Sequence, residues 1–154
     1  MQKWGDSYWE TYSPVVNMLY VRLILTISKL HNLDSKAINF LLAFPQSDFE
    51  EDIWMYLPIG FQVDGHTEAS SKRSFLLKLN KNLFGLKQGS YNWYEKMKKS
   101  LVDQDFKPSD IDPCLYIGNG MIIITYVEDF IIVVSSIENI NCFVNLMKNW
   151  DTLL

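Results

Sequence analysis

The chain has 154 residues, of which 48% are hydrophobic and 21% are charged, and its formal net charge is −4. These values are ordinary for a globular protein with a hydrophobic core, and they argue against general disorder. No apolar run reaches the ~18 residues of a membrane span, and residues 1–10 lack the apolar stretch of a secretory signal. We therefore expect an intracellular protein that contacts no membrane. Its two cysteines, Cys114 and Cys142, make neither a disulfide framework nor a zinc site.

The basic residues are concentrated in one part of the sequence. Residues 72–99 contain eight of the 14 Lys and Arg residues and a single acid, Glu95. Such a segment could form a track for a polyanion. A solvated face of a Lys-rich helix explains the same pattern more simply, so the charge alone does not assign a partner.

The chain begins with a segment that predicts a helix. Ser13-Pro14 has the hydroxyl N-cap and the N1 proline of a helix start. The apolar residues that follow, up to Leu30, predict a helix buried on much of its circumference, and Asn32 is a plausible C-cap.

Short strands are predicted in the next part of the chain. Residues 34–44 predict a strand that Pro45 interrupts, and residues 53–57 predict a second strand. Residues 62–74 are polar without a period, which indicates a loop. Residues 75–79 then predict a third short strand.

The second half of the chain predicts a helix and a strand joined by a loop. Residues 90–105 have a helical pattern whose apolar face contains Trp93, Met97 and Leu101. Residues 114–117 predict a strand, and Gly118-Asn119-Gly120 is a hairpin turn into the next strand.

Residues 122–134 are the segment on which a functional interpretation depends. Two runs of β-branched residues flank the adjacent acids Glu128 and Asp129, which fall where a tight turn would join two buried strands. Paired carboxylates at a sheet edge are suitable ligands for a hard cation. An ordinary hairpin with a solvated acidic tip is the simpler alternative. Ser136 then caps a last helix that turns four apolar residues inward: Ile140, Phe143, Val144 and Met147.

Together these elements predict one α+β domain over residues 1–154. The mixture of strand runs and helices indicates an antiparallel-rich sheet covered by helices on one face. A ferredoxin-like core is the specific arrangement we expect.

Six short segments carry a resemblance to a known family. They are YWETYSPVV (8–16), AFPQ (43–46), IWMYLPIGF (53–61), LNKNLFGLKQ (79–88), DIDPCLY (110–116) and YVED (126–129). In this order and spacing they resemble the Ty1/copia-type reverse transcriptases of retrotransposons. The resemblance implies a polymerase palm with partial fingers, incomplete on its C-terminal side. It also implies template-directed DNA synthesis on an RNA or DNA template–primer, with deoxynucleotides as substrates and Mg²⁺ or Mn²⁺ as the cofactor.

The catalytic positions of this family are only partly kept. The resemblance places three metal-binding aspartates at Asn39, Glu128 and Asp129, and only Asp129 matches. Asp129 and Glu128 therefore remain as metal ligands, whereas Asn39 offers a neutral amide. Neither Asp34 nor Asp48 is placed to substitute. We expect this site to bind metal poorly and to polymerise little or not at all.

Three further positions match the family's nucleotide contacts. Phe44 matches the aromatic residue beneath the nucleotide sugar, and Gln88, with Lys87 beside it, matches a glutamine that contacts the incoming nucleotide. Without the resemblance, core packing for Phe44 and a solvated loop for Lys87 would be the simpler interpretations.

Two other classes of function remain open. A non-catalytic nucleic-acid-binding module could use the basic segment together with Tyr91, Trp93 and Tyr94. A metal-independent structural domain would bind neither metal nor nucleic acid. Metal hydrolases are disfavoured because His31 and His66 are isolated. Catalytic triads lack a partnered histidine motif, and a glycosidase has no support beyond the presence of acids.

Overall fold

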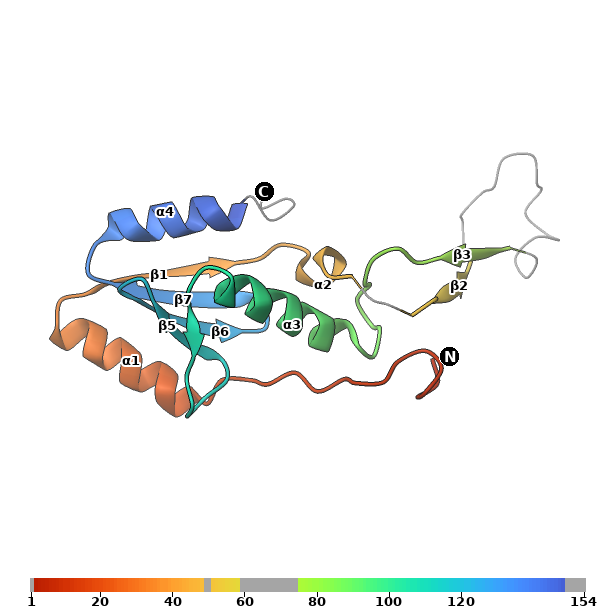
Figure 1. The fold of residues 1–154 in the computed structure, drawn as a ribbon, viewed down its shortest axis with the longest axis horizontal. Helices are drawn as coiled ribbons and strands as arrows, with labels where there is room; N and C mark the ends of the chain where they lie inside the picture. Colours follow the sequence, from red (N-terminus) through yellow and green to blue (C-terminus); the bar gives the residue numbers. More distant parts are fainter. Residues whose placement is uncertain (1, 49–50, 59–74, 149–154) are drawn as a thin grey trace.

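The structure, a computed structural model, describes residues 2–48, 51–58 and 75–148. Its centre is a five-stranded antiparallel sheet with the strand order β1-β7-β6-β5-β4 (Figure 1). A separate ribbon of β2 and β3 lies beyond one end of this sheet. The strands are β1 (Asp34–Asn39), β2 (Trp54–Tyr56), β3 (Leu76–Lys78), β4 (Lys107–Pro108), β5 (Leu115–Gly118), β6 (Met121–Tyr126) and β7 (Asp129–Val134).

The helices cover both faces of the sheet, and the prediction of helices on one face is wrong. They are α1 (Met18–Leu30), α2 (Ala43–Gln46), α3 (Gly89–Val102) and α4 (Ile137–Lys148). Because side chains alternate along a strand, Phe130 and Ile132 of β7 join the core under α3 and α4. Val133 joins a smaller core under α1. Both faces of the hairpin strands are apolar, so each face needs a cover.

Helix α1 begins later than predicted. Ser13 and Pro14 lie in the extended segment before it, and Asn17 is the N-cap. The Asn17 side chain accepts a hydrogen bond from the Leu19 amide at 2.9 Å, which satisfies one of the free N–H groups of the first turn. The backbone N–H of Asn17 in turn donates a hydrogen bond to the Asp112 carboxylate at 3.0 Å, so a loop distant in sequence helps to fix where the helix starts.

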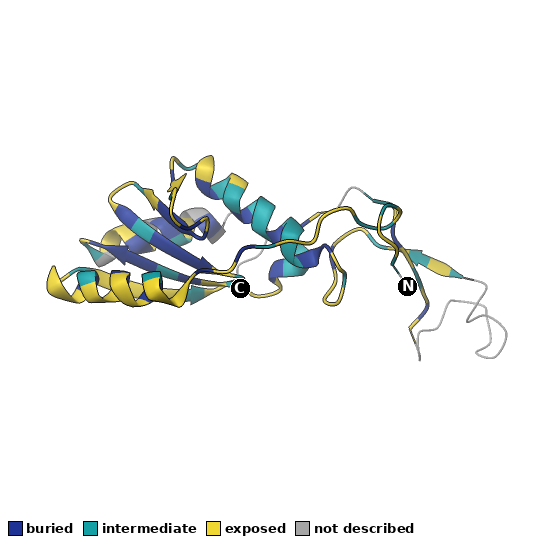
Figure 2. Ribbon diagram, turned by 90° about the horizontal axis from the view of Figure 1, so that it is seen from below, coloured by how far each residue is buried: buried dark blue, intermediate teal, exposed yellow. Residues whose placement is uncertain are grey.

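Helix α1 is also less buried than predicted. Its buried residues are Val21, Ile24 and Ser28, whereas most of its other large apolar side chains are exposed (Figure 2). His31 is the C-cap, and Asn32 follows it with φ 51°. The predicted C-cap is therefore displaced by one residue, and Asn32 takes the left-handed conformation that often ends a helix.

The strand predicted over residues 34–44 ends at Asn39. Leu42 has φ 55°, which reverses the backbone direction and starts the short helix α2. Pro45 lies inside this helix, where its missing N–H costs nothing because first-turn amides have no intrahelical partner. Neither α2 nor the two-residue strand β4 was predicted.

The remaining described elements match the predictions within a few residues. Trp93, Met97 and Leu101 of α3 are buried, and Ile140, Phe143 and Met147 of α4 meet them in the same core. Asn119 and Gly120 form the two-residue turn between β5 and β6. The loop predicted over residues 62–74 lies outside the described residues. Within the described ranges, no helix has the length and apolar character needed to cross a membrane.

Candidate functional site

The ends of β1 and β7 bring two of the predicted site residues together. Asn39 and Asp129 are directly opposite each other in the β1–β7 ladder. The Asn39 side-chain Nδ2 donates a hydrogen bond to Asp129 Oδ1 at 2.8 Å, at an exposed edge of the sheet. The amide therefore presents a donor to the carboxylate of Asp129, at the position where the resemblance led us to expect another carboxylate.

Glu128 lies beside this pair, in the turn that joins β6 to β7. Tyr126 and Asp129 close the turn, so Val127 and Glu128 are its two central residues and Asp129 is the first residue of β7. The sequence had placed both acids in the turn itself. The Phe40 amide donates to the Glu128 carbonyl at 2.9 Å, which ties the turn to the end of β1.

Helix α3 contacts the same turn through Trp93. The Trp93 Nε1 donates to the Val127 carbonyl at 2.7 Å. Only 1% of Trp93 is exposed, and its ring packs against Phe40 with 5.5 Å between ring centroids. The sequence had identified Trp93 as a buried residue of α3, but nothing in the pattern indicated a contact with the acidic turn.

The residues present do not fit a pair of divalent cations. Two-metal sites need several oxygen ligands that carry negative charge. Here Asn39 contributes an amide whose N–H groups face Asp129. Among the described residues, no group of three His, Cys, Asp or Glu side chains is arranged to hold a metal ion.

The two other acids considered at this site do not replace the missing carboxylate. Asp34 pairs with Val134 at the opposite end of β1. Asp48 forms an ion pair with Lys81 at 2.6 Å, and this hydrogen bond lowers the pKa of the Asp48 carboxyl below its usual value.

Gln88 is held by the N-terminal segment. Its Nε2 donates to the Ser7 carbonyl at 3.1 Å, and its Oε1 accepts from Gln2 Nε2 at 2.8 Å. Gln2 Oε1 also accepts from the Lys87 amide at 2.9 Å. Gln88 is 2% exposed, so both ends of its amide are already used within the chain.

Phe44 and Lys87 differ in their environment. Phe44 is half-buried in α2, and its ring lies 5.3 Å from that of Phe84 and near Gly89 at the start of α3. Packing therefore accounts for part of its contacts. Lys87 is exposed, in agreement with the solvated-loop interpretation of its side chain.

Four lysines of the basic segment contact neighbouring groups in the described residues. Lys96 Nζ donates to the Gln46 carbonyl at 2.6 Å. Three further lysines form ion pairs with neighbouring acids (Lys78 with Asp52, Lys81 with Asp48 and Lys98 with Glu95). Three of the six basic residues of this segment that the structure describes are therefore paired with acids.

Comparison with known proteins assigns the chain to a family. The model described as "Reverse transcriptase (RNA-dependent DNA polymerase)" matches residues 1–152. The chain belongs to this reverse transcriptase family. The relatives of the chain are polyproteins of copia-type transposons, in agreement with the resemblance that the six segments carry. No solved structure gave a significant match.

Three polyproteins illustrate the relationship. The retrovirus-related Pol polyprotein from transposon TNT 1-94 of Nicotiana tabacum is 36% identical over 137 residues, which cover 86% of this chain and 10% of the relative. The one from transposon RE1 of Arabidopsis thaliana is 29% identical and covers 85% and 9%. The transposon Ty1-NL2 Gag-Pol polyprotein of Saccharomyces cerevisiae is 29% identical and covers 83% and 7%. The chain thus spans a tenth or less of the length of these relatives.

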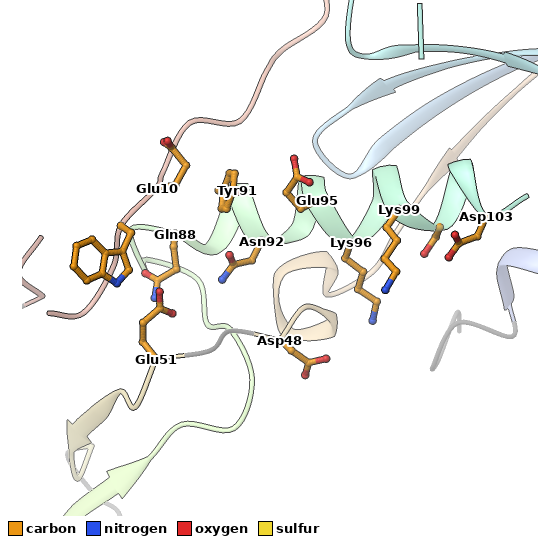
Figure 3. Close-up of a pocket in the computed structure, with 12 residues that line it drawn as sticks. Glu10, Asp48, Glu51, Gln88, Tyr91, Asn92, Glu95, Lys96, Lys99 and Asp103 are labelled. Carbon is orange, nitrogen blue, oxygen red and sulfur yellow. The ribbon is translucent and has the colours of Figure 1, made fainter. Parts of the chain in front are cut away.

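A groove in the described part of this reverse transcriptase chain lies along α3, and the residues of the acidic turn do not line it. It has a volume of about 780 Å³ and runs between α3, the N-terminal segment and the residues after α2 (Figure 3). Neither Asn39 nor Asp129 lines it. Its charged lining residues are mostly acidic: Glu10, Asp48, Glu51, Glu95 and Asp103, against Lys96 and Lys99. This excess of acids disfavours a nucleic-acid backbone in the groove.

Proposed function

We propose that residues 1–154 form one domain, the palm and part of the fingers of a copia-type reverse transcriptase, and that this domain is impaired in nucleotidyl transfer. The order β1–α3–β6–β7–α4 supports the palm, because it supplies the first five elements of a βαββαβ ferredoxin-like unit. Residues from α3 and α4 share one core on one face of these strands, as that unit requires.

The hydrogen bond between Asn39 and Asp129 carries the proposal of impaired catalysis. A polymerase site clamps the attacking and leaving oxygens with two cations, and carboxylates hold these cations. The chain offers an amide donor in place of one carboxylate. Glu128 keeps its charge but is longer by one bond of ~1.5 Å. A displacement of about 1 Å at a catalytic group can cost on the order of a hundredfold in rate.

Primer extension on an RNA template tests this proposal. The unmodified chain is compared with the Asn39→Asp/Glu128→Asp double variant, in Mg²⁺ and separately in Mn²⁺. We expect extension from the double variant and at least a hundredfold less from the unmodified chain. Equal extension by the two proteins would contradict impairment. Absence of extension from both would contradict the assignment of the loss to these two positions.

The substrates proposed are those of the family: a template–primer and a deoxynucleotide. Phe44, Lys87 and Gln88 are the proposed nucleotide contacts. The side-chain amide of Gln88 is hydrogen-bonded to Gln2 and Ser7. Nucleotide binding at Gln88 therefore requires the N-terminal segment to move. A Gln2→Ala variant should therefore bind nucleotide no more weakly than the unmodified chain.

A second candidate is nucleic-acid binding without catalysis, supported by the β2–β3 ribbon. Trp54 and Tyr56 are 53% and 65% exposed, and as residues i and i+2 of a strand they share one face. Lys78 lies opposite Trp54, with its Nζ 5.8 Å from the ring centroid. Exposed aromatic rings near a cation are a platform on which bases stack. Trp93, which the sequence had suggested for this role, is buried and unsuited to it.

A binding titration separates the two candidates. A fluorescent single-stranded oligonucleotide is titrated with the unmodified chain and with Trp54→Ala/Tyr56→Ala at two salt concentrations. Stacking contributes about 1–3 kcal/mol per base, so the double substitution should weaken binding at least tenfold. If binding is unchanged by the substitutions, the ribbon is not the platform.

A further inference from the structure

The turn that carries Glu128 has an unfavourable residue at its first central position. Val127 has φ 55°, whereas Glu128 does not have a positive φ. A two-residue hairpin turn of this kind favours glycine first. A β-branched residue in the left-handed region is a conformational outlier. It destabilises the turn by roughly tenfold in its equilibrium constant, since 1–2 kcal/mol is the usual cost.

Such a conformation persists only where the surroundings impose it. Two hydrogen bonds from outside the hairpin reach the two central carbonyls. The Trp93 Nε1 donates to the Val127 carbonyl at 2.7 Å, and the Phe40 amide donates to the Glu128 carbonyl at 2.9 Å. The Trp93 bond is the one made by a side chain, and it comes from a different element, α3.

Trp93 is well placed to impose this geometry because its own position is fixed. The ring is 1% exposed, and Phe40 packs against it at 5.5 Å. Phe40 also contacts Phe130, the second residue of β7, with 4.6 Å between centroids. The indole of Trp93, the residue after β1 and the start of β7 therefore pack together around the turn.

We propose that Trp93 is a positioning residue: its indole N–H holds Val127 in the left-handed conformation and thereby fixes Asp129 opposite Asn39. Trp93 does not touch the reacting groups itself. That Asp129 belongs to a polymerase site rests on the proposed function, whereas the positioning of the turn does not.

A double-mutant cycle tests the proposal without metal, nucleotide or nucleic acid. Trp93→Phe removes the donor and keeps an aromatic ring, and Val127→Gly removes the conformational penalty. We expect Trp93→Phe to lower the folding equilibrium constant about tenfold or more in the Val127→Gly background, where the bond is lost in full. The loss should be clearly smaller in the Val127 background, because there the turn relaxes and the release of the strain at Val127 offsets part of it. Trp54→Phe, at an exposed position, is the matched control and should change little in either background.

A local spectroscopic signal distinguishes positioning from simple core packing. In ¹⁵N-labelled protein, the Asn39 side-chain amide signals should shift toward those of a free amide in Trp93→Phe and return toward their original position when Val127→Gly is added. Equal losses of stability in both backgrounds, with unchanged Asn39 signals, would overturn the proposal.

A measurement on the unmodified chain covers the case in which Trp93→Phe does not fold. The Trp93 indole proton should exchange with solvent at least a hundredfold more slowly than that of exposed Trp54. Similar exchange rates would show that the bond to Val127 does not persist in solution and would also overturn the proposal. Because none of these readouts involves catalysis, a failure of primer extension would leave this result unaffected.

Discussion

The two hairpin turns at the ends of β6 both reverse the chain, but their positive-φ positions are occupied by different types of residue. Asn119 and Gly120 have φ values of 50° and 70°, and Asn-Gly is the favoured pair for such a turn. The other turn places Val127 at φ 55°, where a β-branched side chain is strained. The first turn is favoured by its own residues, whereas the second depends on hydrogen bonds from Phe40, which follows β1, and from Trp93 of α3. The turn that carries the acidic residue of the candidate site is the one that tertiary structure must hold.

The largest expected effect concerns the packing beside the first turn. A Cβ on Gly118 would lie 2.6 Å from the Asp105 carbonyl oxygen and 2.9 Å from Phe106 Cα. Both are backbone atoms, so the chain must shift to accept a methyl group. We expect Gly118→Ala to lower the free energy of unfolding by about 1–3 kcal/mol, measured by urea denaturation.

The matched control for this change is Gly89→Ala. Its added Cβ would lie 3.6 Å from the nearest atom, at the first residue of α3. This substitution should cost far less. Equal costs at the two glycines would mean that the close approach at Gly118 does not limit packing.

A substitution of Gly120 by valine would create in the first turn the same kind of backbone strain that Val127 causes in the second turn. Gly120 has φ 70° and open space around its Cβ position, so Gly120→Val adds conformational strain without a clash. We expect a loss of about 1–2 kcal/mol in the free energy of unfolding. Gly120→Asn, which tolerates the left-handed region, should lose clearly less. If valine is tolerated as well as asparagine, strain at positive φ is not what distinguishes the two turns.

A substitution at Asn39 tests the electrostatics of the second turn. Asn39→Asp replaces the hydrogen bond to Asp129 by two facing carboxylates, which repel each other when ionised. We expect a loss of about 1 kcal/mol at neutral pH. Repulsion vanishes where both carboxyls are protonated, so the loss should appear as the pH rises above about 3.9, the unfolded-state pKa of aspartate.

The measurement for Asn39→Asp is urea unfolding at acidic and neutral pH, with Asn39→Ala as the control. The alanine variant loses the hydrogen bond without gaining a charge, so its cost should not grow as the pH rises. A pH-independent cost in the aspartate variant would contradict the predicted repulsion.

The sequence predicted those parts of the fold that local patterns specify. The apolar spacing of Trp93, Met97 and Leu101 predicted the buried face of α3, and the Asn-Gly pair predicted the turn after β5. Both features depend on residues that are near one another in the chain.

Features that depend on distant contacts were missed. The start of α1 is set in part by Asp112, 95 residues from Asn17, and the strand predicted through Phe44 ends early because the chain reverses at Leu42. The covering of both sheet faces also follows from tertiary packing. At the candidate site, the hairpin pattern indicated Glu128 and Asp129 as a possible cation site, whereas Asn39 was identified only through the family resemblance. The hydrogen bond from Trp93 to Val127 joins residues 34 positions apart, and no local sequence pattern predicts it.

Cation binding tests the central claim most directly. Mn²⁺ is titrated into the unmodified chain and into the Asn39→Asp/Glu128→Asp variant, and free Mn²⁺ is measured by electron paramagnetic resonance. The amide of Asn39, bonded to Asp129, should leave the unmodified chain at least tenfold weaker in Mn²⁺ affinity than the variant. Equal affinities in the two proteins would contradict the claim that these residues no longer fit a catalytic cation pair.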